Sequence, residues 1–225
     1  MISFKGAHFP QEVILVCVRW YVAYPLSYRN IEEMMAERGV VVDHSTLNRW
    51  VIRFAPLLEQ EFRARKRLIG SSWRMDETYI KVKGEWKYLY RAVDQEGNTV
   101  DFLLTARRDH KAALRFFNKA ISSNSEPIKI NIDKSGSNTA GIEGYNYDEG
   151  AYIEIRQCKY LNNIVEQDHR FIKKQVAPTL GFKSFRAAAA TIAGIELMHM
   201  IRKGQMRKKN GWPQTPAQQF YSLAA

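Results

Sequence analysis

Apolar residues in the first part of the chain recur with the spacing of α-helices. Residues 11–21 form a strongly apolar run, and residues 27–38 place apolar side chains on one face before Gly39 ends the helix. The third helix has the clearest apolar stripe, at i, i+3, i+4 and i+7: Leu47, Trp50, Val51 and Phe54. We therefore predict an all-α head over residues 1–56, ending at the proline that follows Ala55.

The apolar spacing changes to a period of two after a charged stretch, residues 57–72, which we predict to be a helical linker with a flexible end. Alternating apolar residues bounded by turn residues then predict three strands, over 75–83, 86–93 and 99–104. Beyond them, helical spacing and short apolar runs alternate, which predicts helices over 109–122, 163–176 and 184–202 and strands over 128–132 and 152–156.

This order of elements predicts an α/β fold, with a mixed five-stranded sheet and flanking helices behind the all-α head. The α/β core is assigned to residues 73–178. Residues 179–225 are predicted to add a C-terminal helix and a basic tail that pack on the core; the tail includes Lys208 and Lys209. The Gly- and Asn-rich residues 136–150 have weak helix propensity.

The charge balance narrows the choice of partners. Lys and Arg number 34 against 23 Asp and Glu, which gives a formal net charge of +11. Such an excess favours nucleic acid or an anionic membrane as partner, although many basic proteins carry only a solvated positive face. The apolar run 13–18 is too short to cross a bilayer, and no amphipathic anchor stands out. Cys17 and Cys158 lack metal-binding or disulfide spacing, so we expect a cytoplasmic protein with reduced thiols.

The head has the pattern of a helix-turn-helix, because two short helices are joined by a tight turn that contains glycine. Asn and Arg can bind adenine and guanine edges, while Ser and Thr can bind phosphates. A plain three-helix bundle with solvated arginines is the alternative. The residues that the second helix of the motif would present to DNA are His44, Ser45, Thr46, Asn48, Arg49 and Arg53.

Three carboxylates fall at positions where they could share one site. Asp76 lies in the first predicted strand, Asp133 ends the fourth, and Glu166 opens the helix after the fifth. Residues far apart in sequence meet if two lie on neighbouring strands and the third lies on a helix beside them. Carboxylates are the ligands that Mg²⁺ prefers, and two such ions can catalyse phosphoryl transfer. The sequence therefore predicts a metal site that acts on a polyanion, for which DNA is the natural candidate.

Each carboxylate also has an ordinary interpretation. Asp76 could lie on the exposed side of its strand, with Glu77 on the opposite face, although Asp is depleted in strands. Asp133 could initiate a turn. Glu166 fits a capping-box spacing at the start of its helix. Asp168 falls off the face of Glu166 and is the less favoured third ligand.

Three basic residues share the helix face of Glu166, at i+3, i+4 and i+7. They are His169, Arg170 and Lys173. One interpretation is a solvated Glu–Arg pair, which contributes roughly 0.3–0.5 kcal/mol. The functional interpretation is a cationic row beside the metal site that holds the DNA backbone.

Several segments resemble the DDE transposases of bacterial insertion sequences, above all the insertion-sequence-six family. The segments are 26–29 (LSYR), 43–46 (DHST), 73–82 (WRMDETYIKV), 88–94 (YLYRAVD), Asp133-Lys134 and 159–169 (KYLNNIVEQDH). The resemblance implies a ribonuclease-H-like, integrase-type core in which Asp76, Asp133 and Glu166 are the catalytic and metal-binding triad. It also implies two Mg²⁺ ions, for which Mn²⁺ can substitute, and places Lys173 where many such enzymes carry a basic residue.

The same resemblance implies a reaction on double-stranded DNA. The head would bind the terminal inverted repeats, and the core would nick the ends and transfer the freed 3′-OH to target DNA in replicative, cointegrate-forming transposition. A homodimer or higher oligomer would act on paired ends at the nucleoid. The interval from Asp133 to Glu166 is slightly short for the family, so the helix between them is expected to be short or distorted.

Two other classes of protein remain as alternatives. The first is a non-catalytic DNA-binding protein derived from a transposase, which the intact triad argues against. The second is a ribonuclease-H-like nuclease without strand transfer, which the predicted helix-turn-helix makes less favourable.

Overall fold

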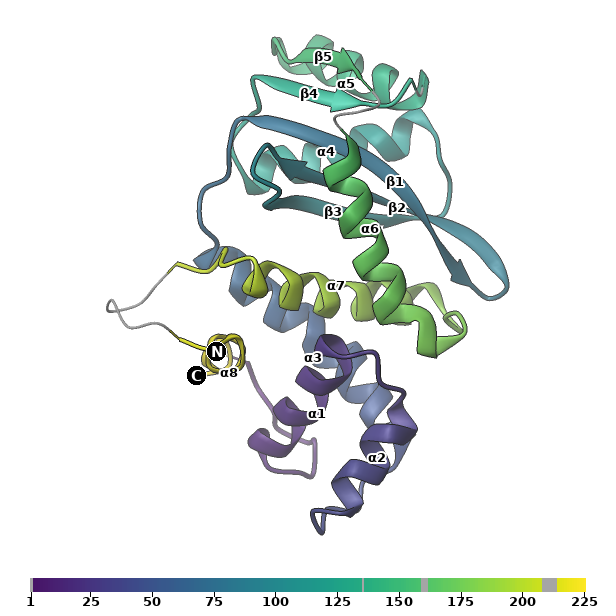
Figure 1. The fold of residues 1–225 in the computed structure, drawn as a ribbon, viewed down its shortest axis with the longest axis vertical. Coiled ribbons are helices and arrows are strands. Elements are labelled where there is room, and N and C mark those ends of the chain that lie inside the picture. Colours follow the sequence, from purple (N-terminus) through teal and green to yellow (C-terminus); the bar gives the residue numbers. More distant parts are fainter. Residues whose placement is uncertain (1, 135, 159–161, 208–213) are drawn as a thin grey trace. The chain divides into compact units, whose positions relative to one another are not determined.

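The computed structural model describes residues 2–134, 136–158, 162–207 and 214–225, which form two compact units (Figure 1). The first unit, called the head unit below, combines Met1–Arg67 with Ile172–Ala225, and the second, the core unit, is Leu68–Phe171. Residues 159–161 of the motif quoted above, and Lys208 and Lys209 of the basic tail, lie outside the described residues. No helix in the described ranges has the length and apolar character needed to cross a membrane.

The head unit begins with the predicted helix-turn-helix. Its helices are α1 (Gln11–Ala23), α2 (Tyr28–Ala36) and α3 (His44–Arg65). Ser27 and Asn30 form a capping box at the start of α2, and the Asp43 carboxylate caps α3 by accepting from the Ser45 amide. Gly39 follows α2 with a φ of 72°, a left-handed conformation that other residues rarely adopt. Local side chains therefore set both helix starts and the turn.

The prediction that the third helix ends before Pro56 is wrong. Helix α3 continues through Pro56 to Arg65, so most of the predicted linker, residues 57–72, is helix of the head unit. Proline removes one backbone donor inside a helix. Here the side chains beyond it stabilise the continuation, because Leu58 and Phe62 are fully buried. Burial of two large apolar side chains offsets the loss of one hydrogen bond.

The C-terminal helix belongs to the head unit, whereas residues 179–225 were predicted to pack on the core. Helix α7 (Phe185–Arg202) follows a 3-10 turn at Ala177–Thr179, and α8 (Pro216–Ser222) completes the unit. Twelve of the eighteen residues of α7 are buried, which requires neighbours on most of its circumference. Gly194 permits the close approach, since a Cβ there would lie 2.5 Å from a Val22 methyl and 3.0 Å from the Ala55 Cβ.

The core unit is built on one mixed sheet with the strand order β3-β2-β1-β4-β5. Its strands are β1 (Ser72–Val82), β2 (Glu85–Asp94), β3 (Thr99–Thr105), β4 (Lys129–Ile132) and β5 (Glu154–Gln157). The first three form an antiparallel meander, while β4 is parallel to β1 and β5 is parallel to β4. This order and these directions are those of the ribonuclease-H-like α/β fold, as predicted.

Three helices accompany the sheet, and two of them cover one face. They are α4 (His110–Ser123), α5 (Gly136–Glu149) and α6 (Asn163–Val176). Side chains of α4 and α5 form one apolar cluster with β1, β2 and β4, in which Trp73, Phe116 and Ile130 are almost fully buried. Helix α6 belongs to both units, because the core unit ends at Phe171 and the head unit resumes at Ile172. The predicted bounds of α6 agree with the structure.

Helix α5 is a regular helix of 14 residues, and not the short or distorted one expected from its composition. Tertiary packing overrides its weak propensity, because Ile142 is fully buried and Tyr145 is buried against the cluster. Gly141 brings α5 close to α4: a Cβ there would lie 2.7 Å from the Ala113 Cβ. The glycine that weakens this helix in isolation is therefore what lets it pack.

We predict opposite effects for two glycine substitutions in α5. Gly141→Ala should destabilise the protein by about 1–3 kcal/mol, because the added methyl overlaps Ala113. The control is Gly144→Ala, which meets no atom within 4 Å and should stabilise the helix by up to about 1 kcal/mol. Urea denaturation measures both; equal shifts in the two variants would show that α5 does not pack this way.

Candidate active site

The sheet brings two of the three predicted carboxylates together. Strands β1 and β4 are parallel neighbours in which Arg74 pairs with Asn131. Two residues further along each chain, this register places Asp76 beside Asp133, just beyond the end of β4. Oxygen atoms of Asp76, Glu77 and Asp133 lie within 4.8 Å of one another. The group called the carboxylate cluster below consists of these three residues.

Glu77 is the residue that the sequence interpretation missed. Alternation along a strand turns it away from Asp76, yet its carboxylate joins the cluster. The reason lies in the strand pairing, because β4 pairs with β1 only as far as Arg74. Beyond Arg74 the edge of β1 has no backbone partner from β4, so side chains from either face of β1 can extend to the position of Asp133. Two acidic residues in succession within a strand, where both types are depleted, were the available signal.

Glu77 is held in place by two donors from other elements. Its side chain is only 4% exposed, and the Arg108 Nε lies 3.0 Å from its Oε1. The Asn138 side chain, at the start of α5, donates to its Oε2 at 3.1 Å. Arg108 also reaches Asp133, with 3.4 Å between Nη2 and Oδ2. Arg108 therefore bridges two members of the carboxylate cluster.

The pKa values of Asp76 and Glu77 are shifted by burial and by the charges close to them. The pKa of Asp76 is raised to about 6, first by burial and then by the charges of Glu77, Asp133 and Glu166, against the hydrogen bond from the Glu77 amide, which lowers it. Burial also raises the pKa of Glu77, against the charge of Arg108. Partly buried like charges favour a bound cation. With oxygen donors alone, the cluster fits a hard divalent ion such as Mg²⁺.

Glu166 lies in the first turn of α6, as predicted, with an exposed side chain. Its charge reaches Asp76, where it contributes to the raised pKa. Its oxygen atoms are not among those of the carboxylate cluster. The structure thus places Glu166 near the two aspartates without bringing its carboxylate into contact with theirs.

The three predicted basic residues of α6 differ in exposure: one is buried near the carboxylate cluster and two face solvent. His169, predicted to bind DNA, is 7% exposed, and its Nδ1 lies 3.9 Å from Asp76 Oδ2. Arg170 and Lys173 are exposed. Of the predicted row, His169 is the member that faces the carboxylate cluster.

Asp168, the less favoured third ligand, has a different partner. Its Oδ2 lies 3.4 Å from the Nε of Arg91 on β2, and both side chains are almost completely buried. A buried ion pair of this kind is costly to break, because removal of one partner leaves an uncompensated charge. The pair attaches the start of α6 to the sheet and commits Asp168 to that contact.

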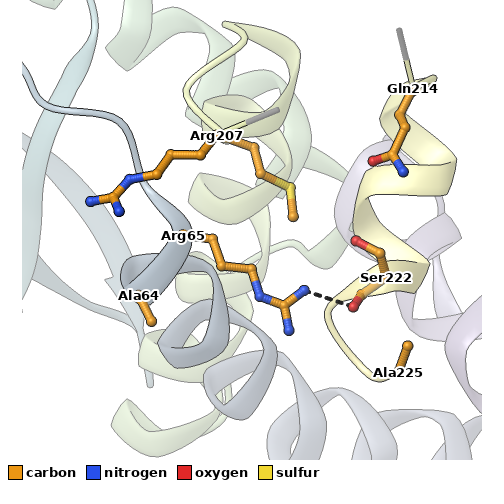
Figure 2. Close-up of a pocket in the computed structure, with 7 residues that line it drawn as sticks. Ala64, Arg65, Arg207, Gln214, Ser222 and Ala225 are labelled. Atoms are coloured by element: carbon orange, nitrogen blue, oxygen red, sulfur yellow. Dashed lines mark hydrogen bonds between the residues drawn. The ribbon is translucent and has the colours of Figure 1, made fainter. Parts of the chain in front are cut away.

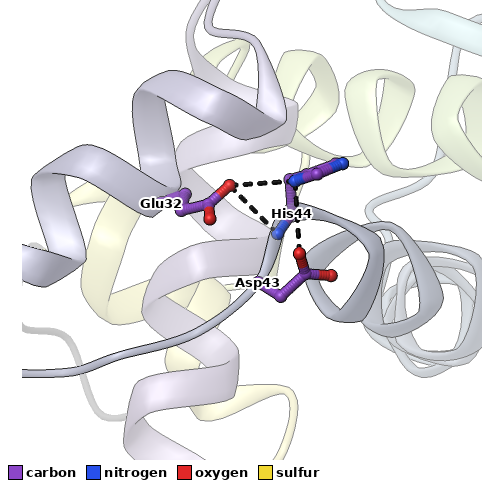
Figure 3. A group of neighbouring side chains, drawn as sticks. All are labelled: Glu32, Asp43 and His44. Atoms are coloured by element: carbon purple, nitrogen blue, oxygen red, sulfur yellow. Dashed lines mark hydrogen bonds and ion pairs between the residues drawn. The ribbon is translucent and has the colours of Figure 1, made fainter.

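At the start of α3, His44 lies between two carboxylates (Figure 3). Glu32 accepts from the His44 backbone amide at 3.2 Å, and its Oε2 lies 3.0 Å from the ring Nδ1. The same Nδ1 lies 3.3 Å from Asp43. Ser45 donates its amide to Asp43 at 2.8 Å. These polar groups brace α2 against the N-terminus of α3.

The remaining predicted DNA-binding residues of α3 differ in their contacts. Asn48 is half-buried and lies close enough to Tyr28 to lower the pKa of that hydroxyl against the effect of burial. Arg53 donates to the Ser3 and Lys5 carbonyls at 3.3 and 3.2 Å. Arg49 is exposed and donates to the Thr46 hydroxyl at 2.7 Å, within its own helix. Arg49 is therefore the residue of this set best placed to reach a ligand.

The head unit also has a hollow of about 490 Å³ near its C-terminus (Figure 2). Its lining includes Arg65, Arg207 and Gln214, and no acidic side chain among the described residues. Arg65 donates to the Ser222 carbonyl at 2.8 Å, and Arg207 donates to the Lys66 carbonyl at 3.1 Å. Both guanidinium groups thus support the backbone of the head unit.

Comparison with known proteins gives consistent matches along the sequence. A family model described as a DDE domain matches residues 70–205, and a model described as the transposase IS66 family matches residues 12–125. A transposase for insertion sequence-like element IS431mec from Staphylococcus aureus is 37% identical over 229 residues, with 100% of both chains covered. A transposase for insertion sequence element IS257 in transposon Tn4003, also from Staphylococcus aureus, is 36% identical over 229 residues with the same coverage.

Among solved structures, the chain is similar to retroviral integrase cores. The HTLV-2 integrase catalytic core domain in complex with magnesium has a TM-score of 0.47 and 19% identity, covering 68% of this chain and 97% of that chain. The catalytic core domain of BIV integrase has a TM-score of 0.45 and 18% identity, covering 69% and 96%.

The raised pKa of Asp76 predicts a pH-dependent stability. Because its folded pKa of about 6 lies above the ordinary value of 3.8, the folded state binds the proton more tightly. This contribution is complete below about pH 4 and is lost as the pH rises through 6. In metal-free buffer, Asp76→Asn should match the wild type at pH 4 and be more stable by on the order of 2–3 kcal/mol at pH 7.5.

Thermal denaturation across this pH range, with a chelator present, measures the difference. Mg²⁺ at pH 7.5 should then raise the melting temperature of the wild type more than that of Asp76→Asn. Parallel stability curves for the two proteins between pH 4 and 7.5 would contradict the prediction.

Proposed function

The chain belongs to the DDE transposases of insertion sequences, which are polynucleotidyl transferases acting on DNA, and we propose that it binds the terminal inverted repeats of its own element and cuts and joins DNA there. The observation that carries this proposal is the carboxylate cluster, in which Asp76 and Glu77 on β1 lie beside Asp133 just beyond the end of β4. Oxygen ligands at that edge, beside the charge of Glu166, suit phosphoryl transfer with a divalent cation.

We assign the ligands as Asp76, Asp133 and Glu166, which would hold two Mg²⁺ ions, with Mn²⁺ able to replace them. Once bound, such ions activate the attacking oxygen and stabilise the departing 3′ oxygen. In this proposal no side chain of the protein serves as a covalent nucleophile, so nicking uses water and strand transfer uses the freed 3′-OH.

Neighbouring residues would orient the ligands. Arg108 contacts both Glu77 and Asp133 and so holds the Asp133 carboxylate at the edge of β1. Asn138 fixes the other oxygen of Glu77. The buried His169 ring restricts Asp76 on its open side. A ligand set held in this way loses little conformational entropy when it binds a cation or substrate.

The helix-turn-helix would recognise the inverted repeats through α3. We propose that Arg49 contacts a base edge, that His44, Ser45 and Thr46 lie toward phosphates, and that Arg53 and Asn48 support the helix. Arg170 and Lys173, both exposed on α6, would contact the DNA backbone. We extend the proposal to a replicative, cointegrate-forming pathway carried out at the nucleoid by a homodimer or higher oligomer on paired ends, as in the family that the sequence resembles.

Asp133→Asn should abolish catalysis and spare DNA binding. We expect nicking and strand transfer on an element-end duplex to fall by about a thousandfold or more, because the site loses a charged ligand. Binding of the same duplex should change by less than about threefold. Radiolabelled-end cleavage and joining assays, with gel-shift titration, measure the two properties.

The matched control is Asp148→Asn, which makes the same chemical change at an exposed position on α5. It should retain full activity. Absence of metal-dependent nicking in the wild type would instead favour the non-catalytic DNA-binding alternative, and full activity of Asp133→Asn would remove this residue from the site.

Arg49→Ala should relax sequence discrimination. Loss of one base contact is expected to reduce the preference for element ends over unrelated duplex by about five- to a hundredfold. The charge-matched control is Arg115→Ala, an exposed position on α4 of the core unit, which should lower both affinities equally or not at all. Competition binding at fixed salt gives the ratio; an unchanged ratio would show that Arg49 does not contact a base.

A further inference from the structure

The end of the β1–β2 hairpin extends beyond the strands on either side of it (Figure 1). Strand β4 pairs with β1 only over Ser72–Arg74, and β3 pairs with β2 only from Tyr88 onward. The pairs from Ile80–Lys87 to Val82–Glu85 therefore have no further strand beside them among the described residues of the sheet. This part of the hairpin is a projection whose side chains do not contribute to the apolar cluster under α4 and α5.

One face of the hairpin carries exposed aromatic rings, from the Tyr79–Tyr88 pair at the base of the projection, where Tyr88 packs partly against the apolar cluster, to Trp86 on the projection itself. Tyr79 pairs with Tyr88 and Lys81 pairs with Trp86, and directly opposed residues of an antiparallel pair point to the same side. The Tyr79 ring centroid lies 5.4 Å from that of Tyr88 and 6.3 Å from that of Trp86. Tyr79 is 48% exposed and Trp86 is 60% exposed. We call these four residues the hairpin aromatic face.

The charge around these rings is positive. The Lys81 ammonium lies over the Trp86 ring, 6.0 Å from its centroid. Residues 79–88 carry three lysines and a single acidic residue, Glu85, which pairs with Lys87 at 2.7 Å. Cross-strand aromatic contacts stabilise a hairpin, but they do not require a lysine-rich surround. Exposed rings among lysines are the combination that binds single-stranded nucleic acid.

The face continues directly from the carboxylate cluster. Glu77, Tyr79 and Lys81 point to the same side of β1, and Tyr79 lies close enough to Arg108 to contribute to the raised pKa of that guanidinium. At roughly 3.3 Å per residue, Tyr79 lies about 10 Å along the strand from Asp76, and Lys81 about 17 Å. Successive phosphates of one strand advance by about 3.4 Å along the helix axis in a duplex and by more in an extended strand. The face is thus within roughly two to five nucleotides of a phosphate at the carboxylates.

We propose that the hairpin aromatic face stacks on an unpaired base of the DNA strand whose phosphate lies at the carboxylate cluster. The base must be unpaired, because both faces of a base inside a duplex are already covered by its neighbours. Stacking on Trp86 and Tyr79 is tolerant of sequence, since every base has a π-face. The role would be to hold the end of the strand open beside the site, so that the phosphate can reach the ligands. This inference rests on the proposed function of that site.

Trp86→Ala tests the proposal, with Tyr152→Ala as its matched control. Tyr152 is 98% exposed and precedes β5, at the end of the sheet opposite Asp133, because β5 runs parallel to β4. The probes are a dT₁₀ oligonucleotide, a blunt element-end duplex, and the same duplex with four terminal bases unpaired. Trp86→Ala should lose roughly tenfold in affinity for dT₁₀ and for the unpaired end, and less than twofold for the blunt duplex.

Two further measurements separate stacking from structure. Trp86→Phe should recover most of the affinity for dT₁₀, because a smaller ring still stacks. The fluorescence of a 2-aminopurine base in the unpaired end should be quenched when the wild type or Tyr152→Ala binds. It should stay unquenched with Trp86→Ala. Circular dichroism and the melting temperature establish that each variant is folded.

The outcomes distinguish this inference from the proposed function. If the wild type nicks element ends but Trp86→Ala and Tyr152→Ala behave alike with every probe, the aromatic face does not bind a base and only the inference fails. If the wild type binds dT₁₀ through Trp86 but does not nick, the inference stands and the proposed reaction fails. A change in sedimentation of Trp86→Ala with unchanged affinity for dT₁₀ would assign the face to contact between copies of the chain, and would overturn the inference.

Discussion

The core unit places three carboxylates together at the edge of β1, and their electrostatic repulsion is the constraint on which the rest of the site depends. Two like charges 4 Å apart near a protein surface repel by about 4 kcal/mol, and burial adds a desolvation cost to each. Burial and the neighbouring negative charges together raise the pKa of Asp76. A destabilising cluster of carboxylates is typical of a site that binds a ligand or carries out a reaction. The repulsion that destabilises the free protein is therefore the same property that makes the edge of the sheet attract a divalent cation.

The fold confines this cost to one place. The parallel pairing of β1 with β4 brings Asp76 and Asp133 side by side, and the early end of β4 leaves room for a ligand between them. Arg108 neutralises part of the charge, since it contacts both Glu77 and Asp133. Beneath the cluster, the apolar packing of α4 and α5 against the sheet holds both strands rigid. A ligand set held on packed strands, with its charge only partly neutralised, suits a site that binds cations and DNA phosphates.

Helix α6 shows how one element can serve both structure and chemistry. Its buried Asp168 pairs with Arg91 on β2, which fixes the rotation of the helix about its own axis. With that rotation set, His169 faces Asp76, and Glu166 lies on the same side one turn earlier. The main effect of the buried ion pair is thus to orient α6. Buried ion pairs make a small or unfavourable net contribution to the free energy of folding.

The sequence by itself determined the order of the elements, the α/β class and the positions of Asp76, Asp133 and Glu166, because periodicity, caps and turn residues act over a few positions. It also pointed to DNA, through charge and through resemblance to known transposases. Tertiary structure alone decided that α3 runs through Pro56, that α5 is a full helix, that α7 packs in the head unit, and that Glu77 and Arg108 join the cluster. Each of these results depends on a partner distant in the chain, whose burial or charge outweighs the local preference of the residues concerned.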